Sequence, residues 1–117
     1  MEMDPAAVRR RLTAEREGVL ARLGALDADV AEVIAASRDT NADDEHDPEG
    51  ATIAFERAQL SALARQARDR LVEIDDAERR LEAGTYGTCE RCGSAIAPER
   101  LEVRPAARLC LPCAAGP

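Results

Sequence analysis

The sequence predicts a mainly α fold: a long antiparallel coiled-coil helical hairpin followed by a C-terminal four-cysteine module. Apolar residues recur every seven positions along two long segments, which is typical of coiled-coil helices. An acidic stretch separates these segments, and all four cysteines of the chain lie after the second one. Aromatic residues make up 2% of the chain and charged residues 33%, which favours helices packed along a narrow seam over a rounded aromatic core.

The first helix is expected to begin at Asp4-Pro5 and to end near Arg38. Aspartate is a preferred N-cap, and proline suits the first helical position. Arg16 interrupts the apolar seam. Its charged end is expected to reach solvent along its aliphatic stem, and the alternative is that it specifies the register or a partner. The seam itself is expected to contain Leu12, Val19, Leu23, Leu26, Val30 and Val33.

A second helix of similar length is expected from Asp47-Pro48 to Ala83-Gly84, where glycine gives a C-terminal stop. Two arms of similar length joined by a turn favour an antiparallel hairpin. Phe55 lies off the apolar stripe of this helix. We expect it to pack against Ile34 near the turn, with contact to a partner as the alternative. The stripe contains Ile53, Leu60, Leu63, Ala67, Leu71, Ile74, Ala77 and Leu81.

The four cysteines have the spacing of a four-thiolate zinc site, C-x2-C-x17-C-x2-C. Zinc prefers a tetrahedron of thiolates, and a site made of four cysteines is closed and structural. A CxxC redox pair would need an oxidoreductase scaffold, and four thiolates holding iron would need a redox partner; the sequence indicates neither. We therefore expect one structural zinc ion in a zinc-finger module over 84–117, after a hairpin over 1–83. The expected ligands are Cys89, Cys92, Cys110 and Cys113.

Charge and composition exclude several functions. The net charge is −7, and the stretch 39–50 has six acidic residues and no Arg or Lys, so it carries −6 of that charge. This balance argues against direct DNA binding, which needs a basic face. A closed metal site, the absence of lysine and the lack of a Ser/His/Asp arrangement or phosphate-binding glycine loop argue against an enzyme. Neither a membrane helix nor a signal peptide is evident, so a cytoplasmic protein is expected, with a monomer favoured.

The C-terminal third resembles the DksA/TraR family of bacterial zinc-finger regulators. The resemblance depends on Tyr86-Gly87-x-Cys89-x-x-Cys92-Gly93-x-x-Ile96, on Arg100-Leu101-x-x-x-Pro105 and on Cys110-x-x-Cys113. It implies a transcription factor that binds RNA polymerase without binding DNA and inserts its hairpin into the secondary channel of the enzyme. The partner-binding tip acids would then be Asp43, Asp44, Glu45 and Asp47.

The tip departs from the better-known members of this family, which carry an Asp-x-x-Asp-x-Ala pattern. Here the nearest fit is Asp44-Glu-His-Asp47-Pro-Glu49, with glutamate in place of alanine. Two alternatives stay open. The acids can be a solvated turn on a coiled-coil scaffold with an inert tip, because aspartate is common in turns. The cysteine module can instead bind nucleic acid, although stacking aromatic residues are scarce.

Overall fold

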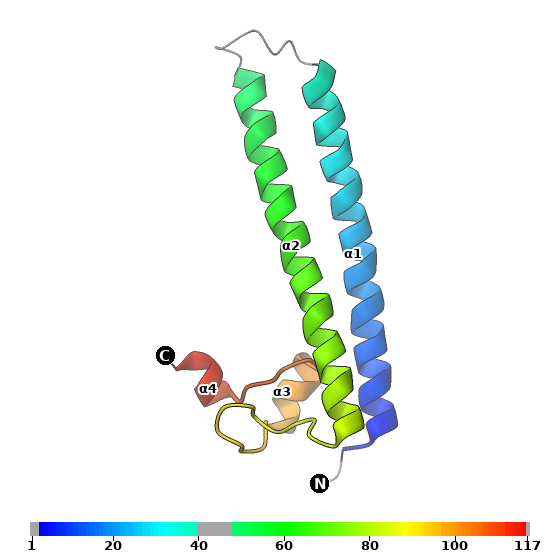
Figure 1. Cartoon of the computed structure of the whole chain (residues 1–117), viewed down its shortest axis with the longest axis vertical. Coiled ribbons are helices and arrows are strands. Elements are labelled where there is room, and N and C mark those ends of the chain that lie inside the picture. Colours follow the sequence, from blue (N-terminus) through cyan, green and yellow to red (C-terminus); the bar gives the residue numbers. More distant parts are fainter. Residues whose placement is uncertain (1–2, 40–47, 117) are drawn as a thin grey trace. The chain divides into compact units, whose positions relative to one another are not determined.

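The computed structural model describes residues 3–39 and 48–116, apart from the side chains of Asp39, Pro48 and Glu49. Over these residues the chain forms two long helices, α1 (Pro5–Asp39) and α2 (Pro48–Ala83), and two short ones, α3 (Pro98–Val103) and α4 (Leu111–Ala115) (Figure 1). The described part of the chain contains no strand, although Thr88 and Ala95 form an isolated antiparallel bridge. The predicted helical hairpin with a C-terminal cysteine cluster is confirmed.

The chain forms two compact units. The first contains Met1–Gly18 and Arg70–Pro117, which hold the start of α1, the end of α2 and the cysteine module. The second is Val19–Asp69, with the remaining parts of α1 and α2. The division into 1–83 and 84–117 that the sequence suggests stays a prediction. None of the helices in the described ranges has a stretch long and apolar enough to span a membrane.

The ends of the long helices follow the local signals in the sequence. Oδ1 of Asp4 accepts a hydrogen bond from the backbone N–H of Ala6 at 3.0 Å, so Asp4 caps α1 as predicted. The second long helix begins at Pro48. It ends just before Gly84, whose φ of 80° is a left-handed conformation that glycine adopts without steric cost.

The core of each unit contains residues of the predicted stripes. In the first unit Leu12, Ile74 and Ala77 are fully buried, as the seven-residue repeat predicts. Val8 is also buried there, one turn before the expected start of the stripe. The buried core of the second unit contains Leu26, Val33, Ala64 and Ala67.

Phe55 does not pack as expected. Its exposed fraction is 70%, so the prediction that it packs against Ile34 is wrong. Two positions on an α-helix differ by about 200° in direction. Ile53 lies on the seam face and is half-buried, so a side chain two positions later points to the outer face of α2. The alternative reading, contact with a partner, stays open.

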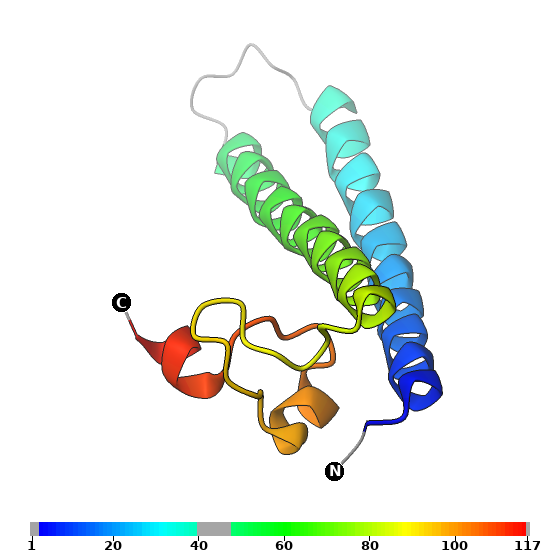
Figure 2. The same ribbon diagram turned by 60° about the horizontal axis from the view of Figure 1, so that its bottom comes forward.

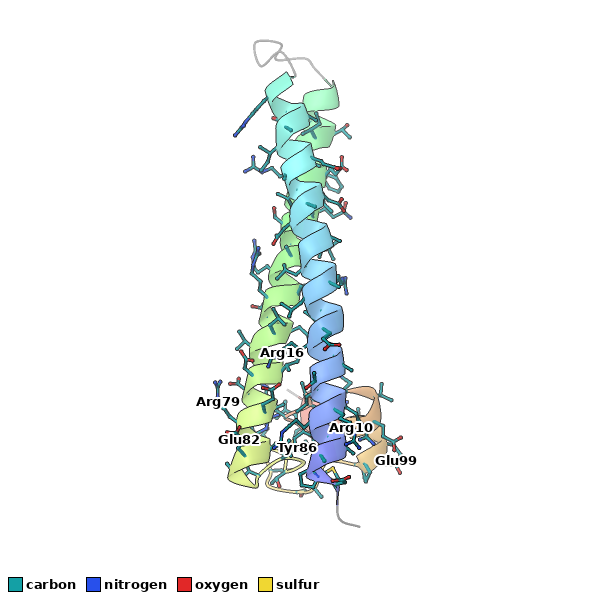
Figure 3. All side chains as sticks on the ribbon, turned by 90° about the vertical axis from the view of Figure 1, so that its right-hand side faces the viewer. Arg10, Arg16, Arg79, Glu82, Tyr86 and Glu99 are labelled. Atoms are coloured by element: carbon teal, nitrogen blue, oxygen red, sulfur yellow. The ribbon has the colours of Figure 1, made fainter. Side chains whose placement is uncertain are left out.

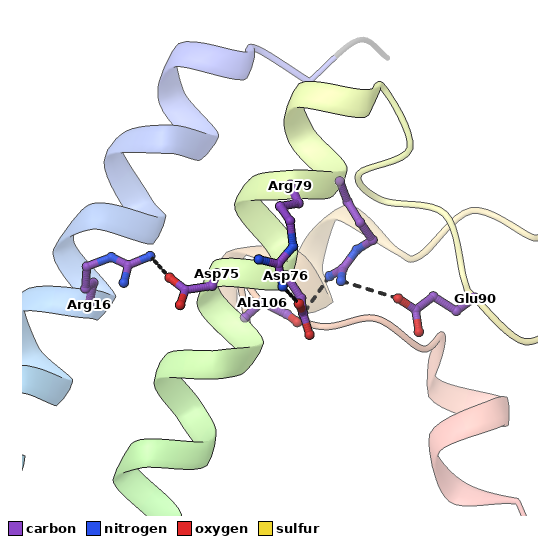
Figure 4. Close-up of polar contacts among 7 residues, drawn as sticks. Arg16, Asp75, Asp76, Arg79, Glu90 and Ala106 are labelled. Carbon is purple, nitrogen blue, oxygen red and sulfur yellow. Dashed lines mark hydrogen bonds and ion pairs between the residues drawn. The ribbon is translucent and has the colours of Figure 1, made fainter.

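Arg16 does not extend along its stem into solvent either. In the first unit its Nη2 lies 2.5 Å from Oδ1 of Asp75 and 2.9 Å from Oε1 of Glu78, so it forms ion pairs from α1 to α2. Figure 3 labels Arg16, and Figure 4 draws its contact with Asp75. Hydrogen bonds to Glu78 and Asp75 raise the pKa of Arg16 above its already high usual value. The alternative reading of a register-setting residue therefore fits the structure better.

Candidate metal centre

The four cysteine sulfurs form a single cluster. All four Sγ atoms lie within 4.8 Å of one another, and Sγ of Cys92 is 3.7 Å from Sγ of Cys110. A tetrahedral zinc with Zn–S bonds of 2.3 Å separates its sulfur ligands by about 3.8 Å. The cluster therefore has the size of a zinc tetrahedron, and four thiolates are the donor set that a closed structural zinc site uses.

The first cysteine pair lies in a tight turn at the start of the module. The backbone N–H of Cys89 donates to the carbonyl of Ser94 at 2.8 Å, and the N–H of Gly93 donates to the carbonyl of Cys89 at 2.9 Å. Gly93 has a φ of 76°, a conformation that a residue with a Cβ rarely adopts. The glycine after the second cysteine thus lets the chain reverse and present both sulfurs on one side.

The second cysteine pair lies at the beginning of α4. Cys110 is the N-cap residue of this helix, and Pro112 occupies its first turn. The backbone N–H of Ala114 donates to the carbonyl of Cys110 at 2.9 Å, which closes the turn around Cys113. Helices as short as α3 and α4 show no apolar period, so the sequence indicated only a loop-rich module here.

Backbone and arginine contacts join the two cysteine segments. The N–H of Glu90 donates to the carbonyl of Arg108 at 2.9 Å. The guanidinium of Arg91 donates to the carbonyl of Cys113 at 3.0 Å. In Figure 2 the loop that carries the first cysteine pair lies beside the segment that leads to α4. A small apolar core beneath the sulfurs consists of Cys89, Ile96, Leu101 and Cys110, with Tyr86, Ala107, Leu109 and Cys113 packed against it.

The hydrogen bonds around the sulfurs give the cysteines different pKa values. Backbone N–H groups of Cys110 and Cys92 lower the pKa of Cys89 to about 6, so this sulfur is a thiolate at neutral pH. A hydrogen bond shared with Cys110 raises the pKa of Cys113 to about 12. Because zinc takes thiolates, loading the site releases the protons that the four cysteines share.

The predicted tip acids Asp43, Asp44, Glu45 and Asp47 lie outside the described residues. The structure brings the four predicted cysteine ligands together, and it adds two features that the sequence did not indicate. Tyr86 donates its hydroxyl hydrogen to the carbonyl of Pro105 at 2.6 Å. Arg80, near the end of α2, contacts both cysteine-bearing segments. Tyr86 and Pro105 belong to the motif that the sequence offered, but the motif does not show that they contact each other. Arg80 lies outside the motif and had no signal in the sequence.

Comparison with protein families identifies the module. The family described as the prokaryotic dksA/traR C4-type zinc finger matches residues 84–116. This segment is a DksA/TraR-type C4 zinc finger. With its four sulfurs clustered, it is able to bind one zinc ion. The family recognised from the sequence and the predicted zinc are thereby confirmed for the module.

Curated relatives align with part of the chain. An uncharacterized protein of Aquifex aeolicus is 52% identical over 44 residues, which cover 38% of this chain and 30% of that protein. General stress protein 16O of Bacillus subtilis is 34% identical over 70 residues, which cover 60% of this chain and 43% of that protein. The RNA polymerase-binding transcription factor DksA of Caulobacter vibrioides is 46% identical over 52 residues, which cover 41% of this chain and 37% of that protein. The chain thus spans less than half the length of these relatives.

The fold has a solved counterpart. The structure of transcription factor DksA2 from Pseudomonas aeruginosa superposes with a TM-score of 0.76 and covers 94% of this chain and 79% of that one. Sequence identity is 24%, so the likeness establishes a shared fold. The superposition spans both the helical hairpin and the cysteine module of this chain.

Proposed function

We propose that this chain is a non-enzymatic transcription regulator that binds RNA polymerase. The observation that carries the proposal is a DksA/TraR-type zinc finger in a chain that shares the fold of DksA2 over 94% of its length. The relative from Caulobacter vibrioides, matched over 52 residues, is named an RNA polymerase-binding transcription factor. The regulator would act in the cytoplasm, where the polymerase works.

In this proposal the turn between α1 and α2 enters the secondary channel of the polymerase. The support is the charge of the stretch 39–50, which holds six acids and no basic residue. At physiological salt an electrostatic field decays over about 8 Å, so the acids act only on groups close to the tip. Carboxylates suit basic side chains and Mg²⁺, which takes oxygen ligands. The acting residues would be drawn from Asp43, Asp44, Glu45 and Asp47.

Zinc would have a structural role in this regulator. Cys89, Cys92, Cys110 and Cys113 would fill all four tetrahedral positions, which leaves no open coordination site for a substrate or water. The metal would tie together two segments whose apolar core is small, since the cluster beneath the sulfurs has four buried residues. The zinc finger would thereby hold together the unit in which α1 begins and α2 ends.

In vitro transcription with the polymerase of the host tests the tip. The double variant Asp44→Asn and Asp47→Asn is expected to bind polymerase like the wild type and to lose the effect on promoter-complex lifetime. Asp29→Asn with Glu32→Gln removes the same charge from exposed positions on α1 and is the matched control. An unchanged transcriptional effect in the tip variant would eliminate the tip mechanism.

A coiled-coil scaffold with an inert tip is the second candidate, and the exposure of Phe55 favours it. A large aromatic side chain that is 70% exposed on the outer face of α2 can supply apolar contact area to another protein. Affinity capture from a bacterial lysate separates the candidates. If wild type retains polymerase subunits, the result supports the regulator. If it retains other proteins that are lost with Phe55→Ala, the result supports the scaffold.

The third alternative, a nucleic-acid-binding module, has its own test. Salt-sensitive retardation of DNA in a gel would indicate that function.

A further inference from the structure

Arg80 connects α2 to the metal centre. Its side chain is only 13% exposed, although it is charged and lies in the last turn of a surface helix. One terminal nitrogen, Nη1, lies 3.4 Å from Oε1 of Glu90. The other, Nη2, donates to the carbonyl oxygens of Ala106 and Ala107 at 3.5 Å each. Figure 4 draws the contacts that reach Glu90 and Ala106.

These acceptors belong to the two segments that bear the cysteines. Glu90 directly follows Cys89 in the first pair, and Ala106 and Ala107 lie just before Cys110 in the second. One guanidinium therefore contacts both halves of the zinc site at once. Its planar fork of donors can make both contacts in one fixed geometry, which a lysine ammonium does not reproduce.

The backbone of Arg80 also terminates α2. Its carbonyl accepts the N–H of Thr85 at 2.9 Å and the hydroxyl of Thr85 at 3.4 Å. The side-chain contacts of 3.4–3.5 Å are at the outer limit of hydrogen bonding, so a small displacement of either cysteine segment breaks them. Arg80 thus ends α2 through its backbone, and its side-chain contacts depend on the spacing of the two cysteine segments.

We propose that Arg80 is a positioning residue that couples zinc occupancy to the order of the last turns of α2. Bound zinc fixes the distance between the two cysteine segments, and only at that distance do Glu90 and the Ala106 carbonyl both meet the guanidinium. Coupling between two equilibria is reciprocal, so Arg80 must also raise the affinity of the site for zinc. The proposal depends on the zinc site and is independent of polymerase binding.

Amide hydrogen exchange on the full chain measures the first effect. In wild type, removal of zinc with a chelator is expected to speed exchange in the last turns of α2 by about tenfold or more. In Arg80→Ala the zinc-loaded protein is expected to exchange there almost as fast as the zinc-free protein. Amides of Ile53–Ala64, which lie in the other compact unit, serve as the internal reference.

Zinc competition with a chromophoric chelator measures the reciprocal effect. Arg80→Ala is expected to weaken zinc binding by about tenfold, the same factor as the expected change in exchange, because the coupling is reciprocal. The matched control is Arg79→Ala, which removes the same charge from the neighbouring position. Arg79 is 70% exposed and pairs with Asp76 on its own helix, so its loss should leave the zinc affinity unchanged.

A residue with a merely structural role would give a different pattern. Arg80→Ala would then speed exchange equally with and without zinc. The ratio of the exchange rate without zinc to the rate with zinc would match that of wild type, and that result overturns the proposal. If Arg80→Ala does not fold, Glu90→Gln and Arg80→Lys are used instead, and both variants must reduce this ratio. The proposal would also be overturned if amide exchange in the last turns of α2 of wild type did not change on removal of zinc.

Discussion

The hydroxyl of Tyr86 donates a hydrogen bond of 2.6 Å to the carbonyl oxygen of Pro105. Tyr86 lies shortly before the first cysteine pair and Pro105 shortly before the second, so the bond fixes the distance between the approaches to the metal site. The ring packs on the buried cluster beneath the sulfurs. Burial raises the pKa of Tyr86 above its ordinary value of 10.0, because the charged phenolate is poorly solvated there.

Tyr86→Phe removes the donor and leaves the ring. We expect it to lower the free energy of unfolding by about 1 kcal/mol, because the Pro105 carbonyl loses its partner while the packing stays. Chemical denaturation of zinc-loaded protein measures the loss. Thr88→Val, which changes an exposed polar side chain nearby, is the control, and an equal loss in both variants would contradict the prediction.

Alkaline pH should destabilise the first unit through the same residue. Tyr86 has a raised pKa in the folded state, so its contribution to stability is complete below the unfolded pKa of 10.0 and declines as pH rises through the folded pKa. Wild type is therefore expected to lose stability above about pH 10 more steeply than Tyr86→Phe. Parallel denaturation profiles for the two proteins would contradict this expectation.

Gly87 is expected to be intolerant of a side chain for two reasons. Its φ is 83°, and a Cβ placed there would lie 2.5 Å from Cε of Met3. Gly87→Ala should cost the about 1–2 kcal/mol typical of a left-handed non-glycine residue, with a small excess because Met3, whose flexible side chain can move aside, must shift. Gly84→Ala is the control, because Gly84 has a φ of 80° with no neighbouring atom within 4 Å.

The two causes can be separated with Met3. When Met3 is replaced by Ala, the additional loss of stability in Gly87→Ala relative to Gly84→Ala should become smaller. The backbone strain remains in both glycine variants. Thermal unfolding of the four variants gives the comparison. An excess that persists without the methionine side chain would show that Met3 is not its source.

Arg16 should set the pairing of α1 with α2 in the first unit. We expect a double-mutant cycle of Arg16→Ala and Asp75→Ala to give a coupling free energy of about 0.5–1 kcal/mol, because solvent screens the half-exposed Asp75. The coupling should fall in high salt. As a control, the neighbouring Asp76 pairs with Arg79 on its own helix, so the cycle of Arg16→Ala with Asp76→Ala should show little coupling.

Cys110→Ser should abolish stoichiometric zinc. Removing one of four thiolates leaves an incomplete tetrahedron, and a structural zinc contributes about 10–16 kcal/mol of apparent binding free energy in small fingers. Elemental analysis is expected to find one zinc per wild-type chain and much less in the variant, with a lower melting temperature. Leu111→Ser places a serine next to Cys110 at a position that is 63% exposed, keeps all four sulfurs and should retain zinc. A metal-free wild type with two disulfides would refute the site.

Local signals in the sequence accounted for the long helices and the cysteine site. Asp4 and Gly84 act through their own backbone neighbours, so a cap and a stop can be predicted without knowing the tertiary structure. The cysteine spacing similarly encodes the turn around Cys89. Each of these predictions needed only residues close together in the chain.

Contacts between distant residues could not be predicted in the same way. Arg16 was expected to reach solvent because nothing in α1 reveals that Asp75 faces it. Phe55 was assigned an intramolecular contact because a large apolar side chain is usually buried, whereas its helical direction leaves it exposed. Arg80 resembles any other surface arginine until the fold brings the segment around Ala106 to it.

Met3 lies close to Gly87 and lines the same pocket as Leu101, which has a consequence for biosynthesis. A ribosome makes the beginning of α1 long before the residues that cover it, so that apolar face leaves the exit tunnel without its partner. The unit that holds the cysteines can close only after Cys113 has left the ribosome. Metal capture should therefore follow the synthesis of both long helices, and shortage of zinc in the cell should leave nascent α1 available to chaperones and proteases.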